Sequence, residues 1–130
     1  MTQAAEGLRD RKKRQTRAAL GRAAVRLVAE HGLDNVTVED ISAAADVSPR
    51  TFFNYFAGKE EALLGPDPEV GPRLRALVVA QPADLSAAAA VREALVAEVA
   101  AELADDRELW LLRMRVVQQH PVLLVKVFAG

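Results

Sequence analysis

The chain has 130 residues, of which 51% are hydrophobic and 27% are charged, and its formal net charge is -1 at pH 7. This length suits one domain, or one small domain with part of another, and the hydrophobic content excludes a disordered chain. The chain has no cysteine, which excludes disulfides, thiolate catalysis and thiolate metal sites and fits a cytoplasmic location. No apolar run is long enough to span a bilayer, so no membrane partner is expected.

Positive charge is concentrated near the N-terminus. Lys and Arg crowd residues 9–26, where Asp10 is the only acidic residue, whereas the part after Glu60 is net negative. A basic head on an acidic body indicates that the head meets a polyanion. The run from Arg9 to Arg17 has two interpretations. It tracks phosphates or reaches into a minor groove, or it is a solvated helix face.

The first elements in chain order are a flexible arm over residues 1–8 and a helix over residues 9–31. Apolar side chains recur in this helix at steps of three and four residues, which gives one apolar stripe. The stripe consists of Leu20, Ala24, Leu27 and Val28. Gly32 follows directly and is a helix-stop signal.

Two short helices come next. Thr37 is a good N-cap for a helix over residues 38–45, and Asp40 stands at the third helical position, as in a capping box. Ser48 can cap a helix over residues 49–56. Two short helices joined by a tight turn form a helix-turn-helix, in which the second helix enters the major groove of DNA.

The helix over residues 49–56 separates a core face from a reading face at about 100° per residue. Phe52 and Phe56 lie four residues apart on the core side. Arg50 and Asn54 lie opposite, with Phe53 beside them. Arg pairs with guanine and Asn with adenine, so both suit base recognition. Each of two residues has an alternative interpretation. Phe53 would be a further core residue instead of a groove contact, and Arg50 would be an ordinary surface arginine instead of a base-reading one.

The rest of the chain is expected to be helical, apart from a loop rich in Gly and Pro over residues 65–72. The helices are expected over residues 59–64, 73–80, 85–104, 107–119 and 122–128. Asp105 and Asp106 are candidate caps between two of them. The predicted fold class is therefore all-α, with a helix-turn-helix domain over residues 9–64 and part of a second helical domain over residues 73–130.

The motifs TVEDI, ADVS, TFFNYF and KEEAL, which begin at Thr37, Ala45, Thr51 and Lys59, resemble the N-terminal domain of the tetracycline-repressor (TetR) family of bacterial transcription regulators. The stretch SPRTFFNYF most resembles an actinobacterial subgroup, some of whose members are linked to mycofactocin gene clusters. In the family, a ligand-binding and dimerisation domain follows and continues with further helices. The resemblance therefore implies that the C-terminal part of this chain is truncated.

The DNA-binding residues that the resemblance implies fall into two groups. Those expected to hold phosphates are Thr37, Thr51, Tyr55 and Lys59. Those expected to face the groove are Pro49, Arg50, Phe53 and Asn54. The family usually has Tyr at the position of Phe53, so one hydroxyl contact is lost. It usually has Gly at the position of Asp46, and Asp tolerates a positive φ better than most residues, so the turn should survive.

In the family, the region after the DNA-binding domain encloses a small molecule. The candidate pocket residues here are Leu95, Val99, Leu103, Trp110, Met114 and Val117. All of them lie at helical spacing, which favours packing in a core over lining a pocket. Arg113 and Arg115 are candidates for an anionic ligand group or ordinary surface arginines. Because a ligand shifts an equilibrium only through different affinities for two states, the effector must favour the form that releases DNA.

We therefore predict a sequence-specific, DNA-binding transcriptional regulator, a repressor responsive to a small molecule. It would read palindromic double-stranded DNA as a homodimer, and exposed apolar residues over 122–128 are a hypothetical means of association. The alternative is a truncated helical interaction module without stable specific DNA binding. No enzyme, metal site or cofactor is expected, because His31 and His120 stand alone at helix ends and no nucleophile or phosphate-loop motif is found.

Overall fold

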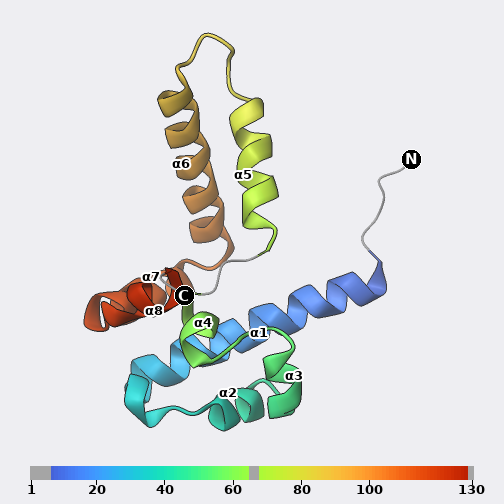
Figure 1. Cartoon of the computed structure of the whole chain (residues 1–130), viewed down its shortest axis with the longest axis vertical. Coiled ribbons are helices and arrows are strands. Elements are labelled where there is room, and N and C mark those ends of the chain that lie inside the picture. Colours follow the sequence, from blue (N-terminus) through green and yellow to red (C-terminus); the bar gives the residue numbers. More distant parts are fainter. Residues whose placement is uncertain (1–6, 65–67, 129–130) are drawn as a thin grey trace. The chain divides into compact units, whose positions relative to one another are not determined.

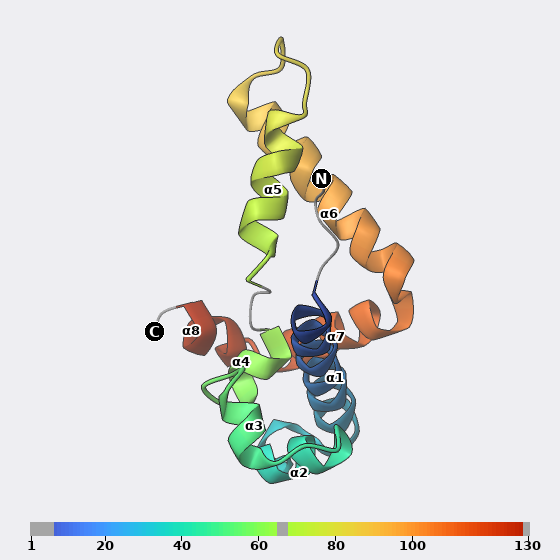
Figure 2. The ribbon, with the colours of Figure 1, turned by 90° about the vertical axis from the view of Figure 1, so that its right-hand side faces the viewer.

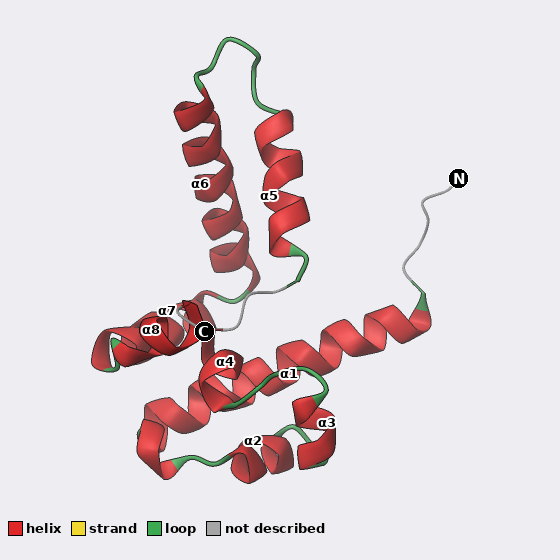
Figure 3. Ribbon diagram, in the orientation of Figure 1, coloured by secondary structure: helices red, strands yellow, loops and turns green. Residues whose placement is uncertain are grey.

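The computed structural model describes residues 7–64 and 68–128, which form helices and connecting turns and include no β-strand (Figure 3). The predicted all-α class is confirmed. Most of the expected arm over residues 1–8 lies outside the described residues. The chain divides into two compact units, one made of residues 1–65 and 112–130 and the other of residues 66–111.

The first unit is built on α1 (Leu8–His31), which begins one residue before the predicted helix and ends where predicted (Figure 1). Of its predicted stripe, Leu20, Ala24 and Val28 are buried, whereas Leu27 is half-buried. The helix ends at Gly32, whose φ of 90° favours glycine and whose N–H donates to the carbonyl of Val28 at 2.8 Å.

A 3₁₀ turn, η1 (Leu33–Asn35), leads into α2 (Val38–Ala44). The predicted capping box is confirmed in both halves. The Asp40 amide donates to Thr37 Oγ1 at 3.1 Å, and the Thr37 amide donates to Asp40 Oδ2 at 2.9 Å. Ile41 is fully buried on α2, which packs against α1. These bonds satisfy amides that the start of a helix leaves without partners.

The turn to α3 (Pro49–Phe53) contains Asp46 at a φ of 60°, as its place in the turn predicted. Ser48 caps α3 by accepting from the Thr51 amide at 3.1 Å. The expected helix over residues 49–56 is too long. After Phe53 the backbone tightens, because the Asn54 and Tyr55 amides donate to carbonyls three residues back, at 3.0 and 2.9 Å.

Figures 1 and 2 both show α2 and α3 on the same side of α1. Their core against α1 includes Ile41, Phe52 and Val25, each fully buried. α4 (Lys59–Leu64) lies against α1 and also against α8 (Val122–Phe128), where Leu63 and Leu123 are buried. The first unit therefore includes a helix from the far end of the sequence.

The second unit is a hairpin of two antiparallel helices, α5 (Val70–Val79) and α6 (Ala87–Asp105) (Figure 1). The predicted starts of both helices are wrong. α5 begins before residue 73 because its first turn accommodates Pro72, which needs no amide partner there. α6 begins after residue 85 because Ser86 caps it, accepting from the Ala89 amide at 3.1 Å.

The remaining helix, α7 (Arg107–Gln119), agrees with the range predicted for it. Asp106 caps it as expected, since the Leu109 amide donates to Asp106 Oδ1 at 3.0 Å. Of the expected loop over residues 65–72, residues 65–67 lie outside the described residues and residues 70–72 are helical.

Candidate nucleic-acid interface

The two faces predicted for the segment from Pro49 to Phe56 differ in exposure. Phe52 is fully buried and Phe56 is 4% exposed, so the predicted core face is confirmed. Arg50 and Asn54 are exposed, and Phe53 is 55% exposed. Of the two interpretations of Phe53, the structure therefore supports an outward-facing side chain. An arginine, an amide and an aromatic ring share one surface, which matches the functional groups that base edges require.

Hydroxyl groups flank this surface. Thr37 is exposed at the start of α2, and Thr51 and Tyr55 are half-buried on the flanks of α3. The Ser48 hydroxyl donates to Thr51 Oγ1 at 3.1 Å, so the Thr51 hydroxyl is left as a donor. Pro49 is exposed at the first position of α3. Hydroxyl donors beside a reading face are typical of groups that contact phosphate oxygens.

Lys59 has a backbone role that the sequence did not indicate. Its Nζ donates to the carbonyl of Leu33 at 2.7 Å and to that of Val36 at 2.9 Å. An ammonium group has three donors, so one remains for a phosphate. Lys59 thus ties the start of α4 to the segment that leads into Thr37. No sequence signal marks this contact, because carbonyls are present at every position.

Arg17 has a similar role that was also missed. Its Nη1 donates to the carbonyl of Tyr55 at 3.3 Å, and its Cζ lies 4.5 Å from the centre of the Phe56 ring. The sequence grouped Arg17 with the basic run, of which Arg9 and Arg11 are exposed. The structure therefore separates Arg17 from the solvated start of α1.

The Asp40 carboxylate is held in its charged form. Its pKa is lowered below the ordinary value of 3.8, first by the hydrogen bond from the Thr37 backbone amide, then by the Thr37 side chain, with a smaller effect from His31. A negative charge at the start of α2 is also favourable to the helix dipole.

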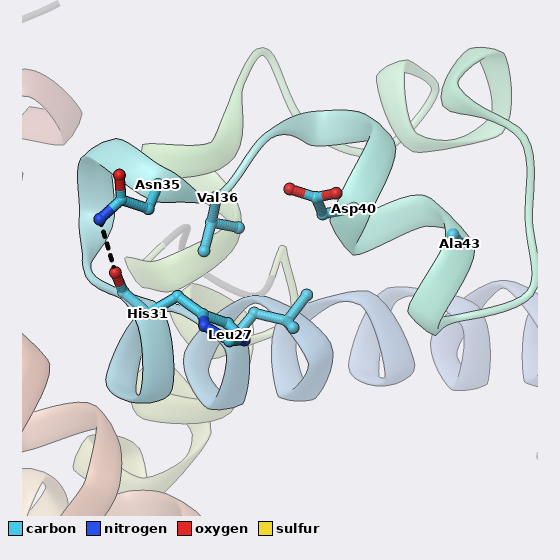
Figure 4. Close-up of a pocket in the computed structure, with 6 residues that line it drawn as sticks. All are labelled: Leu27, His31, Asn35, Val36, Asp40 and Ala43. Atoms are coloured by element: carbon cyan, nitrogen blue, oxygen red, sulfur yellow. Dashed lines mark hydrogen bonds between the residues drawn. The ribbon is translucent and has the colours of Figure 1, made fainter.

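Asp40 borders a hollow of about 330 Å³ between the end of α1 and α2 (Figure 4). The hollow is lined by Leu27, His31, Asn35, Val36, Asp40 and Ala43. Asn35 Nδ2 donates to the carbonyl of His31 at 2.8 Å, as the dashed line shows. None of the predicted DNA-binding residues lines this hollow, and its carboxylate disfavours a phosphate.

The predicted pocket residues are divided between the two units. Leu95 and Val99 are 48% and 39% exposed on α6. Half-buried members are Leu103 and Trp110 in the second unit, and Met114 and Val117 in the first. A hollow of about 470 Å³ between α5 and α6 is lined by Arg73, Leu77, Ala97, Glu98, Ala101, Glu102 and Asp105, and includes none of the six. The pocket assignment stays a prediction.

Two further properties concern the chain within residues 7–64 and 68–128. No group of three or more His, Cys, Asp or Glu side chains is placed there to hold a metal ion. No helix in these ranges combines the length and the apolar character that crossing a membrane requires.

Comparisons with known proteins show which sequences and structures the chain is similar to. Residues 20–64 match the sequence model of the bacterial regulatory proteins of the tetR family. The HTH-type transcriptional regulator TcmR of Streptomyces glaucescens is 38% identical over 125 residues, which are 92% of this chain and 55% of TcmR. The chain thus spans about half the length of this relative.

Among solved structures, the fatty acid degradation regulator FadR from Bacillus halodurans is similar, with 24% sequence identity and a TM-score of 0.43 over 96% of this chain and 68% of that one. The match over residues 20–64 covers α2, α3, α4 and the buried half of α1. With that match and its identity to TcmR, residues 20–64 are a domain of the TetR family of bacterial regulatory proteins.

Proposed function

We propose that the chain is a sequence-specific, DNA-binding transcriptional regulator that inserts residues 49–56 into the major groove. The observation that carries this proposal is the exposure of Arg50, Phe53 and Asn54 on one side of α3, while Phe52 on the other side is fully buried. The name of TcmR, a transcriptional regulator, supports the same function.

In this proposal the site residues form two groups, one that contacts bases and one that contacts phosphates. Base edges are read by Pro49, Arg50, Phe53 and Asn54, and phosphates are held by Thr37, Thr51, Tyr55 and Lys59. Arg donates two hydrogen bonds to guanine, and Asn exchanges two with adenine. The phosphate contacts set the register of the protein on the duplex without reading sequence.

The partners are proposals as well. We infer a palindromic operator, bound by a homodimer in the cytoplasm, and a small-molecule effector that favours the form released from DNA, so that the regulator acts as a repressor. Exposed apolar side chains on α8 support association, since Val122, Leu124 and Val125 are 48%, 47% and 62% exposed.

The test is a selection of bound sequences from random duplex DNA by the purified chain, followed by binding of variants to the enriched site. Arg50→Ala is expected to relax the preference at one base pair. Lys59→Ala is expected to weaken all sequences alike and to lower the slope of log affinity against log salt by about one. Arg92→Ala, an exposed arginine on α6, is the matched control and should bind as wild type does. Wild-type binding by both test variants would refute the assignment of the face.

A helical interaction module without stable DNA binding is the second candidate. Val91, Leu95 and Val96 on α6 are 46%, 48% and 59% exposed, and a surface of this kind favours protein contacts. The two functions differ in salt dependence. A DNA-binding protein loses affinity steeply with salt, whereas an apolar protein contact does not.

A further inference from the structure

Arg17 is the last residue of the basic run from Arg9 to Arg17 on α1, and its guanidinium reaches the segment that follows α3. The Tyr55 carbonyl accepts from Nη1 at 3.3 Å, and the Phe56 ring centre lies 4.5 Å from Cζ. Arg17 is half-buried, in contrast to the exposed Arg9 and Arg11. One guanidinium therefore contacts two consecutive residues that come just after Asn54, the C-cap of α3.

The placement of α3 depends on contacts outside the helix. A helix of five residues is far below the length at which an isolated helix is stable in water. Its first turn is held by the Ser48 cap, and its middle by Phe52, which is fully buried. Its end is a turn in which the Phe56 ring packs 5.6 Å from the Phe52 ring. Arg17 contacts this end from α1.

We propose that Arg17 is a positioning residue, which fixes the end of α3 against α1 and thereby sets how Arg50, Phe53 and Asn54 meet the bases. The consequence for DNA rests on the proposed function. A guanidinium is planar, so it can stack on a ring and donate in its own plane at the same time. Lysine keeps the charge but cannot reproduce this combination.

A phosphate contact by Arg17 predicts a different behaviour. Phosphate contacts are independent of sequence, and each contributes about one to the slope of log affinity against log salt. Lysine replaces arginine well in such a role, because an ammonium also holds a phosphate as a point charge. A positioning residue instead affects the preference for one sequence over another and is not replaced by lysine.

The first experiment compares Arg17→Lys and Arg17→Met with Arg11→Lys and Arg11→Met in the full chain. Affinity is measured for the selected site and for an unrelated duplex over a range of salt concentrations. We expect Arg17→Lys to lose roughly ten-fold in the ratio of the two affinities, about the value of one bidentate base contact, with the slope for the unrelated duplex unchanged. The Arg11→Lys control should keep the ratio.

The second experiment needs no DNA. Hydrogen exchange is compared between wild type and Arg17→Lys at the Tyr55 and Phe56 amides, which donate to the Phe52 carbonyl at 2.9 and 3.0 Å. Both amides should exchange several-fold faster in the variant, while the Ala45 amide at the end of α2 should not change.

The proposal is overturned if Arg17→Lys keeps both the wild-type affinity ratio and the wild-type exchange at Tyr55 and Phe56, whereas Arg17→Met loses affinity equally for both duplexes with a slope lowered by about one. A wild-type chain that prefers no duplex would refute the proposed function. The exchange rates would still decide whether Arg17 holds the end of α3.

Discussion

At the scale of single residues, the turn between α2 and α3 depends on Asp46. Its φ of 60° lies in the left-handed region, which disfavours a residue with a Cβ by about 1 kcal/mol. The turn still closes, because the Val47 amide donates to the Ser42 carbonyl at 2.9 Å. The strain at Asp46 therefore remains in the folded protein.

We expect Asp46→Gly to raise the free energy of unfolding by roughly 0.5 kcal/mol, since glycine removes the strain but gains freedom when unfolded. Ala45→Gly is the matched control at a φ of −92°, where no strain is relieved, and it should lower the free energy by roughly 0.5–1 kcal/mol. Urea unfolding measures both. An Asp46→Gly variant less stable than wild type would mean that the Asp side chain itself stabilises the turn.

The capping box gives a dependence on pH. Because the folded pKa of Asp40 lies below its ordinary value of 3.8, its charged form stabilises the fold at pH above that value, and this contribution is lost as pH falls through the folded pKa. We expect Asp40→Asn to be less stable than wild type at neutral pH. Urea unfolding from pH 7 downward should show the two converging below about pH 4. If the difference in the free energy of unfolding between wild type and Asp40→Asn stayed constant over this range, the charge of Asp40 would not be what stabilises the fold.

These two residues were predicted from the sequence because their partners lie within a few positions. Thr37 and Asp40 are three residues apart, and Asp46 occupies a turn of known geometry. Arg17 and Lys59 were not predicted to face inward. Their partners are carbonyls at least 23 residues away, and a cation carries the same sequence signal whether it meets a backbone or a phosphate.

At the scale of elements, the sequence located the helices better than their ends. Apolar spacing predicted α1 and α7 almost to the residue because glycine, proline and a capping aspartate bound them. It failed at α5, since Pro72 indicates a break in most positions but is tolerated in a first turn. It failed at the end of α3, because packing of Phe56 into the core, and not helical propensity, decides that turn.

An ion pair between Arg73 and Glu98 connects α5 and α6 in the hairpin. Arg73 Nε lies 3.0 Å from Glu98 Oε1 and Nη2 lies 2.6 Å from Oε2, while the Glu98 side chain is only 11% exposed. Removing one member of a pair like this leaves a buried charge without its partner. The Arg73 side chain is 43% exposed, so solvent reduces the effect.

We expect Arg73→Met to lower the free energy of unfolding by roughly 1–3 kcal/mol, and Arg73→Met with Glu98→Met to recover most of the loss. Arg75 is exposed two residues further along α5, so its side chain lies on roughly the opposite side of the helix from Arg73. Arg75→Met should change the free energy of unfolding by less than about 0.5 kcal/mol. Denaturant unfolding of wild type, the two single variants and the double variant measures these free energies. A double variant as unstable as the single one would show that the pair itself contributes nothing beyond packing.

At the scale of the whole molecule, the motifs between Thr37 and Leu63 predicted the family, which the match over residues 20–64 confirms, but the sequence did not define a ligand site. Helical spacing of apolar residues is the same for a core, a cavity wall and an exposed stripe. On α6 it marked Leu95 and Val99, which are about half exposed, whereas small Ala94 is fully buried. These cases differ only in which other elements pack against the helix, and the local periodicity of a sequence carries no information on those neighbours.

Association of two chains is the last prediction, and it rests on α8. Leu123 is fully buried, and Val125 beside it is 62% exposed. A dimer would place two reading helices on half-sites about one turn of DNA apart, so the selected operator should be a palindrome. We expect Leu124→Asp with Val125→Asp to reduce the dimer in sedimentation experiments and to shift the selection to a single half-site.

Leu123→Ala is the control on the buried face of the same helix. It should lower the free energy of unfolding by roughly 2–4 kcal/mol, because it leaves a cavity in the core, while the folded fraction still associates. A wild-type chain that sediments as a monomer at high concentration and selects one half-site would contradict association through α8. It would leave the reading face unaffected, because Arg50, Phe53 and Asn54 belong to a surface that one chain forms alone.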